Sequence, residues 1–311
     1  MAPMRILVSG ATGYLGGLLV QLLVADGHDV RAGGRDPSRL RTLLAANVLA
    51  QGAGGIRGTV ETFELDLLRP ETVRLAMEDV DVAYYLVHSM AEGEVGFVER
   101  DMQAATTFGD AAAQAGVGRI IYLGGLGDEA DDLSPHLRSR HLVGKLLARA
   151  AVPVLEFRAA VVIGAGSASF RMLRQLTDRL PVMITPRWVR VRCQPIAVRD
   201  VLAYLSFALD RPEIGGIVEI GGPDILSYGS MMRRYAALRG QTRLMLPVPV
   251  LTPRLSSYWV GLVTDVAPSI ARPLIEGLRN EVVVRDPEPA RAFGIRTLDY
   301  ESAVRRALGR S

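Results

Sequence analysis

The sequence predicts an α/β protein with a doubly wound parallel sheet and a smaller, mostly helical C-terminal region. Over the first half of the chain, short runs rich in β-branched residues alternate with longer helical patterns, as they do in βαβ units. The chain has 311 residues, 49% of them hydrophobic, so it can bury a large core. A disordered or fibrous protein is excluded by this composition.

Six strands are expected, at residues 4–10, 29–34, 60–66, 81–87, 119–125 and 153–164. The helices between them are expected at residues 14–25, 37–46, 70–77, 96–115 and 135–150. After residue 164 the pattern changes, with helices expected at 167–180, within 195–212 and 216–240, and at the C-terminus. We therefore expect a first domain of residues 1–164 and a C-terminal region of residues 165–311, of which residues 195–222 return to the first domain.

The charge pattern does not favour a nucleic-acid partner. The formal net charge is +3, and the basic residues are spread along the whole sequence instead of forming one run. Cys193, the single cysteine, has no partner for a disulfide, which favours a reducing compartment. A strand pattern begins near residue 4 and leaves no room for a signal peptide. We expect a cytoplasmic protein.

The most apolar later stretch, residues 244–278, contains five prolines and several charged residues. No part of it reaches the roughly 18 uninterrupted apolar residues that a membrane span requires. We interpret it as a helical lid or a subunit contact, with a weak membrane-surface contact as the alternative.

The strongest functional signal is the segment RILVSGATGYLGGLLVQLLVADGHDV, residues 5–30. Gly10, Gly13 and Gly16 follow an apolar strand and open a helix, so the backbone can turn tightly and approach a pyrophosphate at the helix N-terminus. The pattern predicts dinucleotide binding in a Rossmann-type domain, and the alternative is a glycine-rich turn in another α/β protein. Within the same loop, Thr12, Tyr14 and Leu15 are assigned to the cofactor site.

The end of the second strand favours NADP(H) over NAD(H). An NAD site uses a carboxylate there for the ribose hydroxyls, whereas this chain has two glycines followed by Arg35. Arg35 can give bidentate hydrogen bonds to a phosphate, with help from Ser38 and Arg39. Asp36 is the expected cap of the next helix. The alternative is that Arg35 is a solvated surface charge.

The glycine spacing and several later segments resemble the atypical or extended branch of the short-chain dehydrogenase/reductase superfamily, which includes NmrA-like NAD(P)-binding proteins. These segments are ELDLL (64–68), AYYLVHSM (83–90), VGRIIYLGGLGDE (117–129), VLEFRAAVVIGAGS (154–167) and PIAVRDVLAYL (195–205). The resemblance implies that Asp66 and the Leu67 backbone contact the adenine. It also brings further residues to the cofactor, namely Leu86, Val87, His88, Ala160 and Val161. Asp66 as a strand-end cap and His88 as a structural residue are the alternatives.

Standard members of that superfamily carry a Tyr and a Lys four residues later on one helix, with a Ser or Thr after the fifth strand. The resemblance puts Lys145 at the Lys position, His141 at the Tyr position, and Gly124 or Gly125 at the hydroxyl position. Lys145 is therefore expected to bind the cofactor ribose. We expect the catalytic residues to come from Lys145, His141 and His88.

Three hypotheses follow for the chemistry. His141 replaces Tyr as the proton donor, since its ordinary pKa is about 6.5; or Lys145 with a lowered pKa does so; or the protein binds cofactor without turnover and reports redox state. In a fourth, structural interpretation His141 faces solvent and only Lys145 touches ribose. The four histidines show no metal-ligand spacing, and no metal site is expected.

The apolar residues of the C-terminal region favour a small apolar substrate, although each of them is individually typical of a core. They are Phe170, Met172, Trp188, Met231, Met232, Tyr258 and Trp259. The sequence as a whole predicts an NADP(H)-dependent reductase of an apolar carbonyl, quinone or enone, with a non-catalytic redox-sensing protein as the alternative. A homodimer through the helices at 96–115 and 135–150 is possible, as in many relatives.

Overall fold

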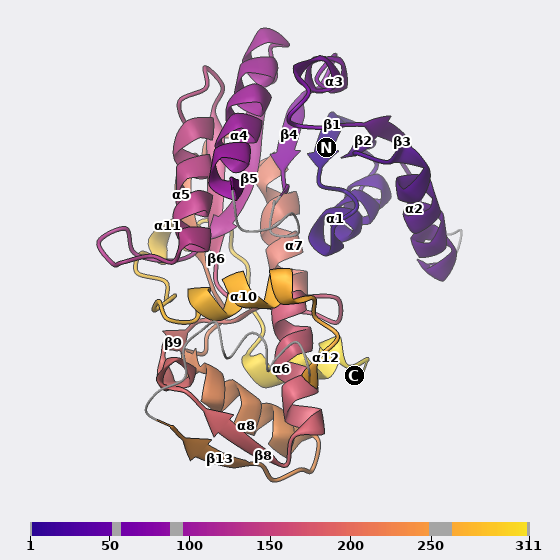
Figure 1. Cartoon of the computed structure of the whole chain (residues 1–311). Coiled ribbons are helices and arrows are strands. Elements are labelled where there is room, and N and C mark those ends of the chain that lie inside the picture. Colours follow the sequence, from indigo (N-terminus) through magenta and orange to yellow (C-terminus); the bar gives the residue numbers. More distant parts are fainter. Residues whose placement is uncertain (1, 52–56, 88–95, 249–262, 310–311) are drawn as a thin grey trace.

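A computed structural model describes residues 2–51, 57–87, 96–248 and 263–309, and its centre is a seven-stranded parallel sheet (Figure 1). The strand order is β11-β6-β5-β4-β1-β2-β3. The strands are β1 (Arg5–Ser9), β2 (Asp29–Gly34), β3 (Thr59–Glu64), β4 (Val82–Tyr85), β5 (Arg119–Gly125), β6 (Val154–Ala159) and β11 (Gly216–Ile220). The order reverses direction between β1 and β4, as in a doubly wound fold. The predicted fold class is confirmed.

Helices cover both faces of this sheet. One face carries α1 (Tyr14–Ala25), α2 (Pro37–Gln51) and α7 (Val198–Phe207), and the other carries α3 (Pro70–Ala76), α4 (Phe97–Gln114) and α5 (Pro135–Leu147). Alternate strand residues explain the two layers, because Ile6 and Val8 join the first cluster whereas Leu7 joins the second. Such near-continuous apolar strands are typical of a parallel sheet buried on both faces.

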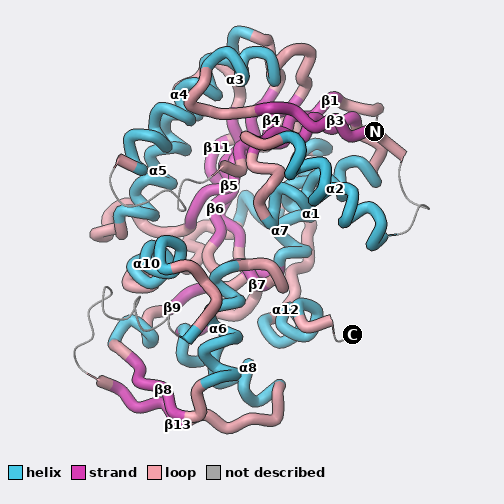
Figure 2. The backbone as a smooth tube through the Cα atoms, turned by 45° about the vertical axis from the view of Figure 1, so that its right-hand side comes forward, coloured by secondary structure: helices cyan, strands magenta, loops and turns pink. Residues whose placement is uncertain are grey.

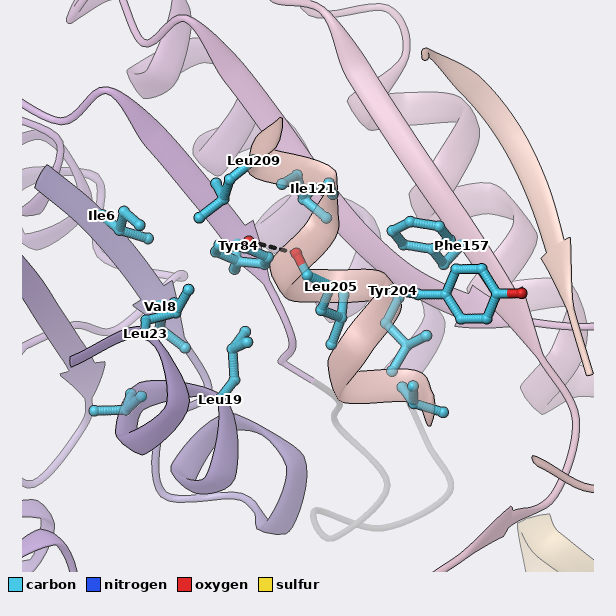
Figure 3. Packing of buried hydrophobic residues seen from close by; sticks show 14 of the residues in the cluster. Ile6, Val8, Leu19, Leu23, Tyr84, Ile121, Phe157, Tyr204, Leu205 and Leu209 are labelled. Carbon is cyan, nitrogen blue, oxygen red and sulfur yellow. Dashed lines mark hydrogen bonds between the residues drawn. The ribbon is translucent and has the colours of Figure 1, made fainter. Parts of the chain in front are cut away.

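The first layer is closed by a helix from the later part of the chain. Figure 3 shows side chains of α1 and α7 packed against those of β1 and β4, and the Tyr84 hydroxyl donates to the Leu205 carbonyl oxygen at 2.7 Å. The end of α7 continues as a 3-10 turn, Ala208–Asp210, and β11 then pairs with β6. Residues 198–220 thus add a helix and an edge strand to the sheet.

The predicted strand at residues 153–164 is wrong in its length. β6 ends at Ala159, and the chain then leaves the sheet and forms β7 (Val162–Ile163), which pairs with β10 (Ile196–Ala197). Residues 160 and 161 therefore lie at the carboxyl end of β6, where ligands bind in open parallel sheets.

The C-terminal region has its own apolar core, formed mainly by α6 (Ala168–Arg179), α8 (Tyr228–Leu238), α10 (Pro268–Gly277) and α12 (Tyr300–Ala307). The smaller elements are β8 (Val182–Thr185), η2 (Arg187–Arg190), β9 (Arg192–Cys193), β12 (Leu226–Ser227), β13 (Leu244–Pro247) and α11 (Glu288–Arg291). Figures 1 and 2 show α10 between the sheet and α6, with β8 and β13 at the far end of the molecule. Among the described residues, every helix is too short or too polar to cross a bilayer.

Candidate active site

The loop between β1 and α1 is built for close approach of the backbone to a ligand. Gly10 has φ +73°, and the Gly13 amide donates to the Gly10 carbonyl at 2.9 Å, so the chain turns tightly before α1 begins. A Cβ atom on Gly10 would lie 2.7 Å from the Leu86 carbonyl oxygen, and one on Gly16 would collide with the Gly10 carbonyl. Only glycine fits at these two positions.

A first cavity of about 250 Å³ opens beside this loop. It lies between the ends of β1, β2, β3 and β4 and the start of α4. Its lining includes eight of the predicted cofactor residues, namely Gly10, Thr12, Gly13, Arg35, Asp66, Leu67, Leu86 and Val87. It also includes Gly33 and Gly34, the two glycines before Arg35, and four residues that the sequence analysis did not single out, Leu65, Leu68, Arg100 and Ala104.

Two arginines line the first cavity. Arg35 is exposed and lines the cavity, and Arg100 adds a second guanidinium from α4. Asp36 turns to its own helix, where its carboxylate accepts from the Ser38 and Arg39 amides at 3.0 Å each. The hydrogen bond from the Arg39 amide is the main cause that lowers the pKa of Asp36. The predicted helix cap at Asp36 is present.

Asp66 lines the first cavity and also stabilises its own turn. Its Oδ1 accepts from the Leu68 amide at 3.0 Å. The carboxylate has a second oxygen with free lone pairs, so capping does not prevent a contact with a ligand.

A second cavity of about 520 Å³ meets the first at Gly10, Gly13 and Leu86. Five further predicted cofactor residues line it, namely Tyr14, Leu15, Gly16, Ala160 and Val161. The rest of the wall comes from the end of β5, the first turns of α5, the start of α6, and α10. This wall is mostly aliphatic, with Leu123, Leu126, Leu137, Ile270, Leu274 and Leu278 among its residues.

The polar groups that α5 turns toward the second cavity are His136 and Arg140, which the sequence analysis missed. The Arg140 guanidinium donates to the Val87 carbonyl at 3.3 Å and to the Leu123 carbonyl, and its carbon lies 5.0 Å from the centroid of the Tyr122 ring. Burial is the main cause that lowers the pKa of His136 to about 3, and the positive charge of Arg140 acts in the same direction. At neutral pH this pair is a neutral imidazole beside a fixed positive charge.

His141 and Lys145 contact a different group, the carboxylate of Glu129 in the loop before α5. The Lys145 Nζ donates to Glu129 Oε2 at 2.6 Å, and its side chain is 53% exposed. The buried His141 ring donates from Nε2 to the Gly125 carbonyl at 3.0 Å and turns Nδ1 to Glu129 Oε1 at 3.5 Å. Neither residue belongs to the lining of the two cavities. The interpretation of His141 as a solvent-facing residue is wrong, because the ring is buried.

The His141 ring is also poorly suited to donate a proton near neutral pH. Burial is the main cause that lowers its pKa, and the nearby Arg158 acts in the same direction. The hydrogen bond from Lys145 lowers the pKa of Glu129. The ion pair of Glu129 with Lys145 connects the loop at residue 129 to α5. His88 lies outside the described residues.

Comparisons with known proteins link part of the chain to a described family. Residues 10–153 match a protein family described as NAD(P)H-binding. The match covers a little under half of the chain. It agrees with the dinucleotide-binding domain that the glycine loop predicts. A comparison with curated proteins gives no significant match.

Solved structures share the fold over nearly the whole chain. A nucleoside-diphosphate-sugar epimerase from Staphylococcus aureus has a TM-score of 0.72 at 16% identity, covering 97% of this chain and 99% of its own. Triphenylmethane reductase from Citrobacter sp. has a TM-score of 0.72 at 17% identity, with 98% and 99% covered. An NADPH-dependent quinone oxidoreductase from Escherichia coli, complexed with NADPH, has a TM-score of 0.71 at 18% identity, with 98% and 100% covered.

Within this NAD(P)H-binding domain, the two glycines at the end of β5 have a packing reason. A Cβ atom on Gly124 would lie 2.8 Å from Glu156 Oε1, and one on Gly125 would lie 2.9 Å from Leu137 Cδ2. A serine or threonine at either position would therefore force its neighbours to move. The buried Glu156 carboxylate and the Leu137 side chain occupy the space that such a residue would need.

The apolar residues that suggested a substrate pocket form the core of the C-terminal region instead. Phe170, Met172, Met231 and Met232 are buried in one cluster, and Trp188 packs against it. Tyr258 and Trp259 lie outside the described residues. Side-chain size and polarity identify such residues as apolar, but only the packing of α6, α8 and α10 decides which of them face the cavity.

Proposed function

We propose that the protein is an NADP(H)-dependent oxidoreductase that reduces an apolar carbonyl, quinone or enone. The observation that carries this proposal is the junction of the two cavities at Gly10, Gly13 and Leu86. With a pyrophosphate held by the glycine loop, the first cavity would take the adenosine half of a dinucleotide. The second cavity would take the nicotinamide half and a substrate beside it.

The preference for NADP(H) rests on Arg35. Its guanidinium lines the first cavity next to Gly33 and Gly34, where a carboxylate would repel a 2′-phosphate. Asp36, the nearest carboxylate in the sequence, accepts from backbone amides of its own helix. The positive charge of Arg35 is therefore the group best suited to receive the extra phosphate of NADP(H).

The substrate class follows from the wall of the second cavity. Most of its residues are aliphatic, so an apolar molecule would lose water there without leaving polar groups unpaired. Two structures with the same fold are described as a triphenylmethane reductase and an NADPH-dependent quinone oxidoreductase, which supports reduction of an apolar, conjugated molecule.

NADPH supplies a hydride when bound, and the substrate is reduced while the cofactor is oxidised. We assign Arg140 the role of stabilising the negative charge that develops on the substrate oxygen. The two carbonyls that it contacts use two of the five donors of a guanidinium. Neutral His136 is a weak acid, so the proton that completes the product comes from water.

The test is NADPH oxidation by the purified protein with a panel of quinones, enones and aromatic aldehydes. Arg140→Lys keeps the charge but loses the planar set of donors, and we expect kcat/KM to fall by about a hundredfold, as when an oxyanion-stabilising donor is removed. Arg138→Lys, on the same helix but exposed, is the matched control. Binding of NADPH without turnover of any panel member would contradict the proposal.

One observation favours a second function, a non-catalytic protein that senses cofactor redox state. By the resemblance to short-chain dehydrogenases, Gly124 or Gly125 stands at the hydroxyl position and His141 at the Tyr position, and His141 lines neither cavity. Calorimetric titration with NADP⁺ and with NADPH tests this alternative. A sensor requires clearly different affinities for the two forms, and equal affinities would remove it.

A further inference from the structure

The two-stranded ribbon of β8 and β13 lies at the far end of the C-terminal region (Figure 1), and one of its faces is aliphatic and exposed. The strands are parallel, with Leu244 beside Val182 and Leu246 beside Ile184. These four side chains lie at alternate positions and therefore share one face of the ribbon. Their exposed fractions are 46% for Val182, 50% for Ile184, 56% for Leu244 and 45% for Leu246.

The opposite face of the ribbon anchors it to the protein. Met183 is buried in the C-terminal core, and Met245 packs against the same core. Gly229 of α8 leaves space for both Met245 and Val189. Because the inner face supplies the packing, the four outer aliphatic residues are not needed to hold the ribbon in place. A contiguous exposed apolar patch of this kind marks an interaction surface.

The segments around the ribbon are strongly basic. Residues 168–192 and 226–247 contain ten arginines, no lysine and a single acidic residue, Asp178, whereas the whole chain has a net charge of +3. The two segments are distant in sequence and come together because β8 pairs with β13, β9 pairs with β12, and α6 packs against α8. Ten of the 36 basic residues of the chain therefore belong to the segments around the ribbon.

Part of this charge is neutralised, and part is not. Four of the arginines form ion pairs with carboxylates, namely Arg171 with Asp265, Arg192 with Glu281, Arg234 with Asp224 and Arg239 with Asp178. Within the described residues, Arg179 and Arg243 donate to backbone carbonyls, and Arg233 donates to Ser230 Oγ. Arg179, Arg190 and Arg233 are exposed to solvent.

We propose that the outer face of the β8–β13 ribbon and the surrounding arginines dock the protein on an anionic lipid bilayer. Exposed aliphatic side chains can enter the boundary between headgroups and acyl chains, while guanidinium groups bind lipid phosphates. Two other partners, a second copy of the chain and a nucleic acid, fit this surface less well. A second copy of the chain would bring two basic faces together, and a nucleic acid offers no apolar surface in its phosphate backbone for the four aliphatic residues.

The experiment is sedimentation of the full chain with vesicles of phosphatidylcholine, alone or mixed with phosphatidylglycerol. We expect binding to the anionic vesicles that weakens as salt is added, and little binding to the neutral ones. The double variant Ile184→Ser, Leu246→Ser should lower the partition coefficient by about tenfold or more, because two half-exposed aliphatic side chains no longer enter the bilayer.

The matched control is Val60→Ser, Ile217→Ser, on the two edge strands of the large sheet, where the exposed fractions are 41% and 50%. We expect this control to bind vesicles as the unaltered chain does. NADPH titration should give the same Kd for all three proteins, which separates this surface from the cofactor site. Equal binding to neutral and anionic vesicles, an equal loss in the control, or a ribbon-dependent dimer or DNA complex in place of vesicle binding would overturn the proposal.

Discussion

Replacing Lys145 by Met tests where the cofactor is held on α5. The resemblance to short-chain dehydrogenases predicts that the Lys145 amino group binds ribose, whereas in the structure it contacts Glu129 at 2.6 Å. Both partners are partly exposed, at 53% and 42%, so the ion pair should contribute less than about 1 kcal/mol to stability. Glu129 Oε1 also lies 3.6 Å from Arg158 Nη2 and 3.5 Å from His141 Nδ1.

We therefore expect Lys145→Met to lower the free energy of unfolding by less than about 1 kcal/mol and to change the Kd for NADPH by less than about twofold. Urea unfolding and fluorescence titration measure the two quantities. Arg138→Met is the matched control, because Arg138 lies on the same helix and forms an exposed ion pair with Asp132 at 3.3 Å.

Lys145 also offers a direct probe, because it is the only lysine in the sequence. Reductive methylation with ¹³C-formaldehyde gives one labelled side chain, whose chemical shift should stay unchanged when NADP⁺ is added. A tenfold weaker Kd in Lys145→Met but not in Arg138→Met, about 1.4 kcal/mol of binding energy, would refute this reasoning. The amino group would then leave Glu129 for the ribose when the cofactor binds.

Three further predictions concern the cavities. Arg35→Glu should weaken NADPH binding by about 10- to 100-fold, with a smaller effect on NADH, since a charge-assisted pair with phosphate becomes a repulsion; equal effects in titrations of the two cofactors would count against Arg35 as the phosphate ligand. Gly16→Ala should abolish NADPH binding, because its Cβ meets the Gly10 carbonyl, whereas Gly17→Ala, with 3.4 Å to its nearest atom, should bind normally. Burial lowers the pKa of His136 from 6.5 to about 3, so between these values the unfolded chain takes up a proton that the folded chain does not. The contribution of this residue to the free energy of unfolding should thus fall by about 1.4 kcal/mol for each unit by which the pH decreases in this window. Urea unfolding at several pH values should show that this free energy depends less steeply on pH in His136→Gln than in the unaltered chain.

Much of the first domain could be predicted because its signals are local. Strands such as β1 and β4 are short apolar runs, and the first helix begins where the glycine loop ends, so α1 has the expected bounds, residues 14–25. Helix α5 begins as predicted, with Ser134 Oγ accepting from the Leu137 amide and Pro135 in the first turn. These elements depend on residues that are close in sequence.

The orientation of α5 could not be predicted, because two pairs of residues on it share the same spacing. His136 and Arg140 are four residues apart, as are His141 and Lys145. A shift of five residues turns a helix by about 140°, so the two pairs point in different directions. Family resemblance selects the second pair, but packing of Leu137 against Gly125 and the contact of His141 with Gly125 turn the first pair to the cavity.

A buried ion pair behind β5 connects the altered positions of the site. Glu156 accepts from Arg158 Nε at 2.7 Å, and a Cβ atom on either Gly124 or Gly144 would collide with its carboxylate. Removing one partner of such a pair costs about 3–5 kcal/mol, so the pair and both glycines must be retained together. A hydroxyl at Gly124 is incompatible with Glu156 in this position. A serine or threonine at Gly124 would thus require Glu156 to move, and in the proposed reduction the charge of Arg140 would stabilise the substrate oxygen instead.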